Sequence, residues 1–342
     1  MIWIIYGINE KLNEKFGSFY YWKINMISKD KAILITWWNG FVWANLVRKL
    51  VGLWYSNIFL ILRESSNLWR INDIIDRVHI KYWSLVDENS IEQIIKEVKP
   101  EIIYHLAAAW AYIWRDGKWV NDLFTTNILW TINLLNACKE IWFEYFVSTW
   151  SSSEYWIKDH PIQESELLEP NNEYWISKAS ATMYCNYIWK KFQLPVYTFR
   201  IFSAFWPYED QSRLIPSLML KYINNESPNL SNPNSVRDYI YVEDIVNYYL
   251  NIDEVEWKYW EVFNLASWKQ HNIWEMVNMV KEISNSDKEP NYWATSVKQD
   301  EPKLWEADMN KTKTCFDIQT TSVYDGLKIT YNRFKENKDL YY

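Results

Sequence analysis

Short apolar runs alternate with segments of helical spacing along the first two thirds of the chain. Five β-prone runs predict buried strands: 31–35, 58–62, 102–106, 145–148 and 196–200. Between them, apolar residues at helical spacing predict four helices: about 42–53, 91–98, 122–141 and 175–192. Strands that alternate with helices are typical of βαβ units, so we predict an α/β fold with a doubly wound parallel sheet. Helices should cover both faces of that sheet.

The charge and the apolar segments disfavour two classes of partner. The net charge of −7 argues against nucleic acid, which requires a basic surface. No stretch reaches the roughly 18 apolar residues that suggest a membrane span. The three cysteines are widely spaced and give no metal or disulfide signal. We therefore expect a cytoplasmic protein with no nucleic-acid or membrane partner.

The first 28 residues precede the first predicted strand. They have neither the basic start nor the long apolar segment of a signal peptide. We interpret residues 1–28 as an N-terminal extension. It is either an extra element or a mis-assigned start, with Met26 as the alternative beginning.

Tryptophan and glycine occur in unusual numbers, 24 and 6 respectively. A fold of this size needs glycine for turns, helix caps and close backbone approach. After the first predicted strand the chain reads TWWNGFVW, and glycine at Trp37, Trp38 and Trp43 would make it TGGNGFVG. Other tryptophans also stand where glycine is expected: Trp54, Trp83, Trp142, Trp150, Trp156, Trp175, Trp206 and Trp268.

Glycine in such a loop has a specific physical purpose. Backbone N–H groups and a helix N-terminus approach a dinucleotide pyrophosphate closely there, and an indole at Trp37 or Trp43 would fill that space. We hypothesise that the source reads the UGA codon as glycine, where the translated sequence shows tryptophan. The alternative is a tryptophan-rich protein whose loop no longer binds a dinucleotide.

Tyr174 and Lys178 form a Y-x-x-x-K pair at the start of a predicted helix. Their spacing of four places both side chains on one helix face. Ser151 lies upstream, at the end of the preceding predicted strand. A tyrosine with its ordinary pKa near 10 is a poor base, and lowering that pKa to about 7 takes roughly 4 kcal/mol. The positive charge of Lys178 would contribute to that shift, and Ser151 could bond the reacting oxygen.

With the loop at 36–43, this Ser–Tyr–Lys set resembles the extended short-chain dehydrogenase/reductase family, in its NAD-dependent epimerase/dehydratase branch. The resemblance covers about residues 31–334 and implies a Rossmann domain with a smaller, discontinuous C-terminal substrate domain. The implied boundaries are 29–202 plus about 236–265 for the first, and about 203–235 plus 266–342 for the second. It also implies a homodimer, and it favours a true tryptophan at Trp69, where the family often has one.

The resemblance implies NAD or NADP as the cofactor. The residues that it places at this site are Thr36, Trp37, Trp38, Asn39, Gly40, Phe41, Val42, Trp43, Arg63, Asp87, Ala107 and Lys178. Arg63 favours the 2′-phosphate of NADP, whereas Glu64 could bond the ribose diol of NAD, so the choice stays open. Asp87 and Ser90 are also candidate N-caps of the helix predicted at 91–98.

The implied substrate is a nucleoside-diphosphate sugar. Its predicted contacts are Ser152, Ser203, Arg213 and Arg237, and no metal ligand is expected. Arg237 is placed on the pyrophosphate, because a guanidinium suits phosphate geometry. The alternative for Arg237 is a structural salt bridge with Asp238 or Asp244. Ser203 stands where the family usually has an asparagine that contacts the phosphates.

The residues after Ser151 bear on the type of reaction. Dehydratases of the family carry an Asp-Glu or Ser-Glu pair there, whereas this chain has Ser152 and Ser153. Glu154 comes one position later and, on strand alternation, should face the other way. Dehydration is therefore disfavoured. His105, which ends a predicted buried strand, is interpreted as structural.

Three functions follow from these patterns. The leading one is epimerisation of a nucleoside-diphosphate sugar, in which Tyr174 removes a proton and hydride leaves to the cofactor and returns to the other face. An NADPH-dependent reductase of a 4-keto nucleotide sugar is the near alternative. A non-catalytic binding protein follows if the tryptophans at glycine positions are real.

Overall fold

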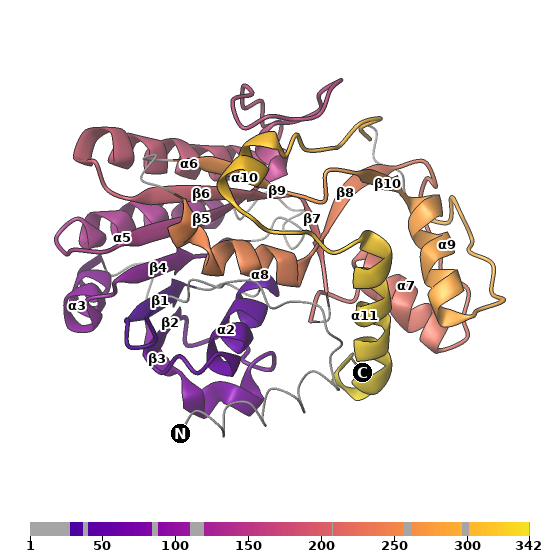
Figure 1. Cartoon of the computed structure of the whole chain (residues 1–342), viewed down its shortest axis with the longest axis horizontal. Coiled ribbons are helices and arrows are strands. Elements are labelled where there is room, and N and C mark those ends of the chain that lie inside the picture. The colour runs from indigo at the N-terminus through magenta and orange to yellow at the C-terminus, as the bar shows by residue number, and fades with distance from the viewer. Residues whose placement is uncertain are drawn as a thin grey trace.

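The centre of the molecule is a parallel sheet. The computed structural model describes residues 28–36, 40–83, 88–109, 120–206, 208–255, 261–295 and 301–341. In that part of the chain, seven parallel strands lie in the order β3-β2-β1-β4-β5-β6-β9 (Figure 1). They are β1 (Ile33–Thr36), β2 (Ile58–Leu62), β3 (His79–Tyr82), β4 (Ile102–His105), β5 (Tyr145–Ser151), β6 (Val196–Ile201) and β9 (Val262–Leu265). The predicted doubly wound parallel sheet is confirmed.

The order of the strands determines where a ligand can bind. The chain runs from β1 outward through β2 to β3, and then from β4 outward in the opposite direction. The connections that follow β1 and β4 therefore leave the sheet toward opposite faces, which opens a crevice at the carboxyl ends of these strands.

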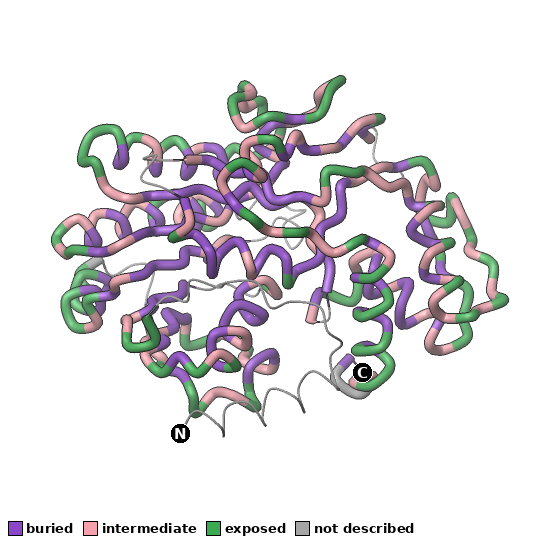
Figure 2. Tube along the Cα trace, in the orientation of Figure 1, coloured by how far each residue is buried: buried purple, intermediate pink, exposed green. Residues whose placement is uncertain are grey.

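Helices cover both faces of the sheet. They are α2 (Val42–Gly52), α3 (Glu88–Val98), α4 (Val120–Phe124), α5 (Trp130–Cys138), α6 (Glu173–Phe192) and α8 (Val242–Leu250). α2 and α8 share one face, and α3, α5 and α6 share the other (Figure 1). Ile33 and Ile35 of β1 join the first core and Leu34 joins the second, because successive strand side chains point to opposite faces. Figure 2 shows the buried residues concentrated along the strands.

A second, smaller sheet lies beside the first. Its order is β10-β8-β7, formed by β7 (Ser203–Phe205), β8 (Val236–Tyr241) and β10 (Gln270–Asn272). Three helices pack together next to it: α7 (Leu214–Ile223), α9 (Ile273–Ser284) and α11 (Val323–Glu336) (Figure 1). Gly326 of α11 lies so close to this sheet that a Cβ would come within 2.9 Å of Phe205 Cζ. The single residue Phe202 joins the end of β6 to the start of β7.

The two sheets bear on the predicted domain boundaries, which stay a prediction. β8 belongs to the small sheet, whereas α8 and β9 belong with the large one. Judged by sheets, the chain returns to the large unit at Val242, later than the predicted return at about 236.

Several predicted elements differ from the observed ones at their ends. The helix predicted at 122–141 consists of α4, a π-helix η3 (Thr125–Leu129) and α5 in succession. The helix predicted at 91–98 begins at Glu88, so Ser90 lies inside it and is not its N-cap. Asp87 and residues 1–27 lie outside the described residues. The remaining short elements are η1 (Asn72–Arg77), η4 (Ser152–Glu154), η5 (Ile252–Glu254), α10 (Asn310–Cys315) and η6 (Lys338–Tyr341).

None of the helices in the described ranges is both long enough and apolar enough to cross a bilayer.

Candidate active site

Ser151 stands at the carboxyl end of β5, where the strand turns into η4. The turn is closed by a reciprocal cap, in which the Ser151 hydroxyl accepts from the Ser153 backbone N–H at 3.2 Å. The Glu154 carboxylate in turn accepts from the Ser151 backbone N–H at 3.3 Å. This capping box fixes the backbone of Ser151 on the side of the sheet where ligands bind.

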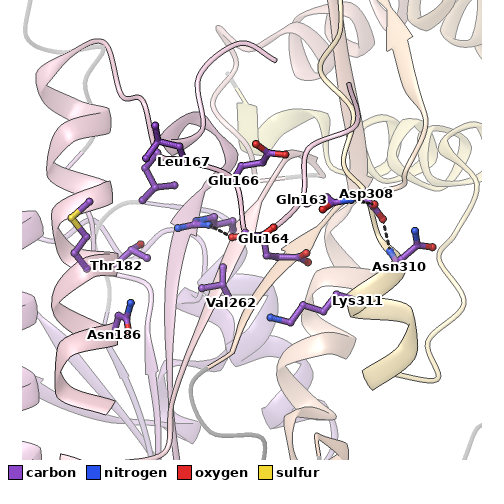
Figure 3. A pocket seen from close by; sticks show the side chains of 14 residues that line it. Gln163, Glu164, Glu166, Leu167, Thr182, Asn186, Val262, Asp308, Asn310 and Lys311 are labelled. Atoms are coloured by element: carbon purple, nitrogen blue, oxygen red, sulfur yellow. Dashed lines mark hydrogen bonds between the residues drawn. The ribbon is translucent and has the colours of Figure 1, made fainter. Parts of the chain in front are cut away.

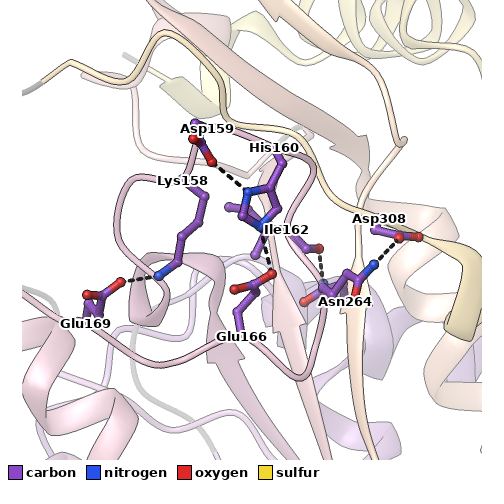
Figure 4. A network of polar contacts seen from close by, with 9 residues as sticks. Lys158, Asp159, His160, Ile162, Glu166, Glu169, Asn264 and Asp308 are labelled. Carbon is purple, nitrogen blue, oxygen red and sulfur yellow. Dashed lines mark hydrogen bonds and ion pairs between the residues drawn. The ribbon is translucent and has the colours of Figure 1, made fainter.

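Polar contacts hold the segment that leads from η4 to α6 (Figure 4). Lys158 pairs with Glu169, and His160 lies between Asp159 and Glu166, at 2.7 and 2.8 Å. At the start of α6, Asn172 accepts from the Trp175 backbone N–H at 3.0 Å and acts as the N-cap. Ion pairs therefore hold the segment that leads to α6, and the Asn172 N-cap fixes the first turn of α6, which carries Tyr174.

The structure brings Tyr174 and Lys178 together on α6. Lys178 Nζ lies 5.4 Å from the centre of the Tyr174 ring and 4.6 Å from that of Trp150. Lys178 is buried, and this burial lowers its pKa to about 7, against the opposing charge of Glu154. Desolvation also raises the pKa of Tyr174, the positive charge of Arg213 lowers it, and Glu154 raises it. Tyr174 therefore needs further positive charge nearby before it can act as a base near neutral pH.

His105 stands at the end of β4, and both of its ring nitrogens make contacts inside the fold. Nδ1 is 2.7 Å from the Thr36 hydroxyl and Nε2 is 2.8 Å from the Thr131 hydroxyl. Burial, together with the charge of Lys178, lowers the pKa of His105 to about 3, so the ring is neutral. These contacts fit the structural role that the sequence predicts for His105.

The predicted dinucleotide residues gather around β1, α2 and β2. α2 begins at Val42 without a side-chain cap and without an acidic residue in its first turn, so its N–H groups suit an anion. Gly40 is exposed, Phe41 is half-buried, and Ala107 is buried after β4. Trp43 is fully buried in the core at the first turn of α2. Trp37, Trp38, Asn39 and Asp87 lie outside the described residues.

Arg63 extends from the end of β2 toward η3. Its Nη2 donates to the Thr126 hydroxyl at 3.1 Å. Burial lowers the pKa of this guanidinium to about 10, and Asp122 opposes that change, so Arg63 stays charged at neutral pH. Glu64 is exposed. A half-buried cation at this position can hold a phosphate, which keeps NADP among the candidates.

Asn127 is a residue of this site that the sequence analysis missed. Its amide accepts from the Ala109 backbone N–H at 2.7 Å and donates to the Ser177 hydroxyl at 2.8 Å. It therefore ties the end of β4 to α6, from a π-helical turn of the kind often found at functional sites. Asn127 is one of three asparagines in the helix predicted at 122–141, so the sequence alone does not single it out.

Three predicted substrate residues lie at or near the small sheet, around Tyr239. Ser203 pairs with Tyr239 across β7 and β8. Burial raises the pKa of Tyr239 to about 12, and the positive charges of Arg237 and Arg213 lower it, so both guanidinium groups lie near this hydroxyl. Arg213 also pairs with Glu209 at 3.4 Å. The fourth predicted contact, Ser152, is buried in η4.

The salt-bridge alternative for Arg237 named the wrong partners. Arg237 pairs with Glu301 at 3.1 Å. Asp238 instead accepts from Ser267 and from the Ala307 backbone, and Asp244 accepts from Thr321. Both aspartates are buried and hold loops. Asp238 points away from Arg237 because successive residues of β8 point to opposite faces, whereas Asp244 lies in the first turn of α8.

A cavity of about 780 Å³ lies farther along α6, beginning one turn after Lys178 (Figure 3). Leu167, Thr182, Asn186, Val262 and Lys311 are among the residues that line it. Ser151, Tyr174 and Lys178 do not line it. The convergence of polar groups at the carboxyl ends of β5 and β7 is therefore a better candidate active site than this cavity.

Comparison with known proteins identifies the family. The sequence model described as GDP-mannose 4,6 dehydratase matches residues 34–317. The dTDP-D-glucose 4,6-dehydratase of Dictyostelium discoideum is 26% identical over 237 residues, which are 64% of this chain and 54% of that protein. The alignment thus spans about half the length of this relative.

Two solved structures have the same fold. UDP-glucose 4-epimerase of Thermotoga maritima, solved with UDP-glucose, has a TM-score of 0.79 and 25% identity and covers 90% of this chain and 99% of its own. UDP-glucuronic acid 4-epimerase of Bacillus cereus, in complex with UDP-glucuronic acid and NAD, has a TM-score of 0.76 and 23% identity, with coverage of 89% and 99%. The chain belongs to the GDP-mannose 4,6-dehydratase family, among the epimerase and dehydratase enzymes of the extended short-chain dehydrogenase/reductases.

Proposed function

We propose that this protein is an NAD(P)-dependent epimerase of a nucleoside-diphosphate sugar that works through a transient keto-sugar. The observation that carries the proposal is the buried Lys178 ammonium, 5.4 Å from the Tyr174 ring and beside the strand that ends in Ser151. Relatives with this fold include epimerases solved with UDP-glucose or with UDP-glucuronic acid and NAD.

The described residues fit a dinucleotide. The uncapped start of α2 offers backbone N–H groups to a pyrophosphate, and Arg63 offers a half-buried cation at the end of β2. Bound there, NAD(P) would take a hydride from a sugar carbon and return it to the opposite face. The fit extends to positions 37 and 38 if glycine occupies them, as the UGA hypothesis predicts.

The three site residues have distinct roles in this proposal. Tyr174 takes the proton of the sugar hydroxyl and later returns it. Lys178 lowers the pKa of Tyr174 through its charge, which desolvation strengthens because few water molecules screen it. Ser151 donates to the reacting oxygen and orients it between the base and the hydride acceptor. Arg213 and Arg237 would bind the diphosphate from the small sheet.

The surroundings of Ser151 favour epimerisation over dehydration. Elimination of water needs an acid near the leaving group, and Ser152 and Ser153 supply none. Glu154 is fully buried and its carboxylate is bonded to Arg200 Nε at 3.0 Å, inside the fold. The strand alternation from which the orientation of Glu154 was predicted does not apply, because β5 ends at Ser151 and Glu154 lies in the 3₁₀ turn η4.

The first experiment identifies the nucleotide that stays bound to the purified protein, expressed with glycine at the predicted positions. An epimerase returns its own hydride and gains nothing by releasing its cofactor, so we expect retained NAD. Incubation with UDP-glucose, dTDP-glucose and GDP-mannose should then yield an epimer of one of them. Tyr174→Phe should lower kcat at least about 100-fold, because general acid–base catalysis contributes that much, and should leave the retained nucleotide in place.

Other outcomes support the alternatives. Binding of added NADPH without retained NAD would favour the 4-keto sugar reductase, which the half-buried Arg63 also suits. Native protein with tryptophan at positions 37 and 43, and without affinity for either dinucleotide, would leave the non-catalytic binding protein.

A further inference from the structure

Glu154 has a fully buried carboxylate that touches three elements of the large sheet. One oxygen accepts from the Ser151 backbone N–H at the end of β5, at 3.3 Å. The other accepts from the Thr182 hydroxyl of α6 and from Arg200 Nε of β6, each at 3.0 Å. Arg200 is itself buried and donates onward to the Tyr155 hydroxyl at 2.7 Å. Glu154 therefore ties together the strand, the helix and the turn that surround the proposed site.

Glu154 contacts two parts of the proposed site: the backbone of Ser151 and the helix that carries Lys178. Ser151 carries the hydroxyl that would orient the substrate, and Glu154 holds its backbone. Thr182 follows Lys178 by one helical turn, so both residues lie on the same face of α6. The Glu154 carboxylate thus lies on the face of α6 that presents the Lys178 ammonium.

We propose that Glu154 is a positioning residue for the Ser151–Tyr174–Lys178 site, one that fixes Ser151 and supplies the negative charge that keeps buried Lys178 protonated. The role for catalysis rests on the proposed function, whereas the effect on the charge of Lys178 does not. Glu154 acts through these residues and touches no reacting atom.

The other groups around Lys178 cannot supply that negative charge. His105 of β4 is neutral, since its pKa lies at about 3, and Tyr174 of α6 is protonated because burial raises its pKa. The Trp150 ring of β5 is uncharged. Arg200 of β6, which pairs with Glu154, and Arg213, which acts on Tyr174, are cations. Among the described residues, Glu154 provides the charge that raises the pKa of Lys178 against its burial.

Removal of this charge has a predictable sign. Burial holds the pKa of Lys178 at about 7 while Glu154 opposes it, so a neutral residue at 154 lowers the pKa of Lys178 below that value. Lys178 then loses its proton at a lower pH, and the charge that assists Tyr174 disappears. The basic limb of the kcat profile, which reports loss of that charge, should move to lower pH by about 1 unit or more.

The test compares Glu154→Gln with Glu164→Gln. Glu164 is a neighbouring, largely buried carboxylate that accepts from the Asn264 backbone, away from Lys178. In Glu154→Gln we expect kcat near pH 8 to fall about 10-fold or more with KM changed less than about 2-fold, along with the shift of the basic limb. Glu164→Gln should keep the wild-type profile.

A second variant guards against loss of folding. Glu154→Gln leaves the buried Arg200 without its partner, which destabilises the protein. The double variant Glu154→Gln, Arg200→Met removes both charges and should show the same shift of the basic limb. A wild-type pH profile in a folded Glu154→Gln or double variant would overturn the proposal.

NMR titration of the lysine side chains separates this inference from the proposed function. Lys178→Met assigns the Lys178 resonance, and Glu154→Gln should titrate at lower pH than the wild type. A shifted titration in a protein that turns over no nucleotide sugar would contradict the proposed function and leave the charge effect standing. An unchanged titration would contradict the inference, whatever the activity.

Discussion

In the part of the chain that the structure describes, four tryptophans have a backbone φ in the left-handed region: Trp54 at 67°, Trp156 at 60°, Trp268 at 62° and Trp293 at 62°. A side chain in this region costs roughly 1–2 kcal/mol per residue, a cost that glycine does not have. The sequence pattern predicts glycine at Trp54, Trp156 and Trp268, and the backbone supports it there for an independent reason. Glycine is also expected at Trp293, on the basis of its backbone conformation alone.

The UGA hypothesis predicts the composition of peptides from the native protein. Peptides that cover positions 54, 156, 268 and 293 should contain glycine when they are sequenced by mass spectrometry. Trp69 provides the internal control, because its ring lies 5.7 Å from Tyr208 and supports the Arg70 guanidinium at 4.5 Å, so it should remain tryptophan. Tryptophan at the four left-handed positions would refute the hypothesis.

At the scale of elements, five strands of the large sheet could be predicted from the sequence because each is a compact apolar run, whereas the short buried strand β9, interrupted by Asn264, was missed. β2 was predicted with its observed bounds, whereas β3 was missed because His79–Tyr82 is a partly exposed edge strand without an apolar run. Tyr174 and Lys178 could be expected together because they are four residues apart on one helix, whereas the site that they form with Ser151 stays a prediction. The contacts of Glu154 with Arg200 and of Arg237 with Glu301 join distant segments, so local patterns carry no signal for them.

His105 links β1, β4 and α5, and this link makes the fold sensitive to acid. Its pKa is about 3 in the folded state and 6.5 when exposed, so between these values the unfolded chain binds more protons. Stability from this group is therefore complete above about pH 6.5 and is lost as the pH falls toward 3, by up to about 5 kcal/mol.

The prediction for His105 is checked by urea unfolding between pH 4 and 7. His105→Asn should be less stable than the wild type at pH 7, because the contact with Thr131 is lost. Its stability should decline less steeply on acidification. The raised pKa of Asp244, about 7, makes the fold more stable as the pH falls, which is the opposite of the His105 effect. Because both proteins contain Asp244, the difference between their pH curves reports His105 alone. Parallel pH curves would contradict a buried, neutral His105.

At the scale of the whole molecule, the proposed site is shared between the two sheets. Tyr174 and Lys178 belong to α6 on the large sheet, and Arg237 belongs to β8 of the small one. Arg213, at the start of α7, influences both Tyr174 and Tyr239. A nucleotide sugar that spans this distance would place its diphosphate on the small sheet and its sugar at Tyr174.

Arg237→Ala tests that arrangement. A charge-assisted bond to phosphate contributes about 1.5–3 kcal/mol, so binding of UDP-glucose, or of whichever sugar nucleotide is turned over, should weaken roughly 10- to 100-fold by calorimetry. The retained dinucleotide should be unaffected. Arg333→Ala, at an exposed arginine of α11, is the matched control and should bind as the wild type does. Equal affinity in the two variants would place the diphosphate elsewhere.

The junction at Phe202 has a mechanical consequence. One residue separates β6 from β7, so a torque applied to the small sheet is passed directly to the strand that holds Arg200. The two sheets are thus joined by an almost continuous strand, with Phe202 buried at the junction. A group bound on the small sheet would therefore sit one residue away in the chain from the strand that carries the Arg200–Glu154 ion pair.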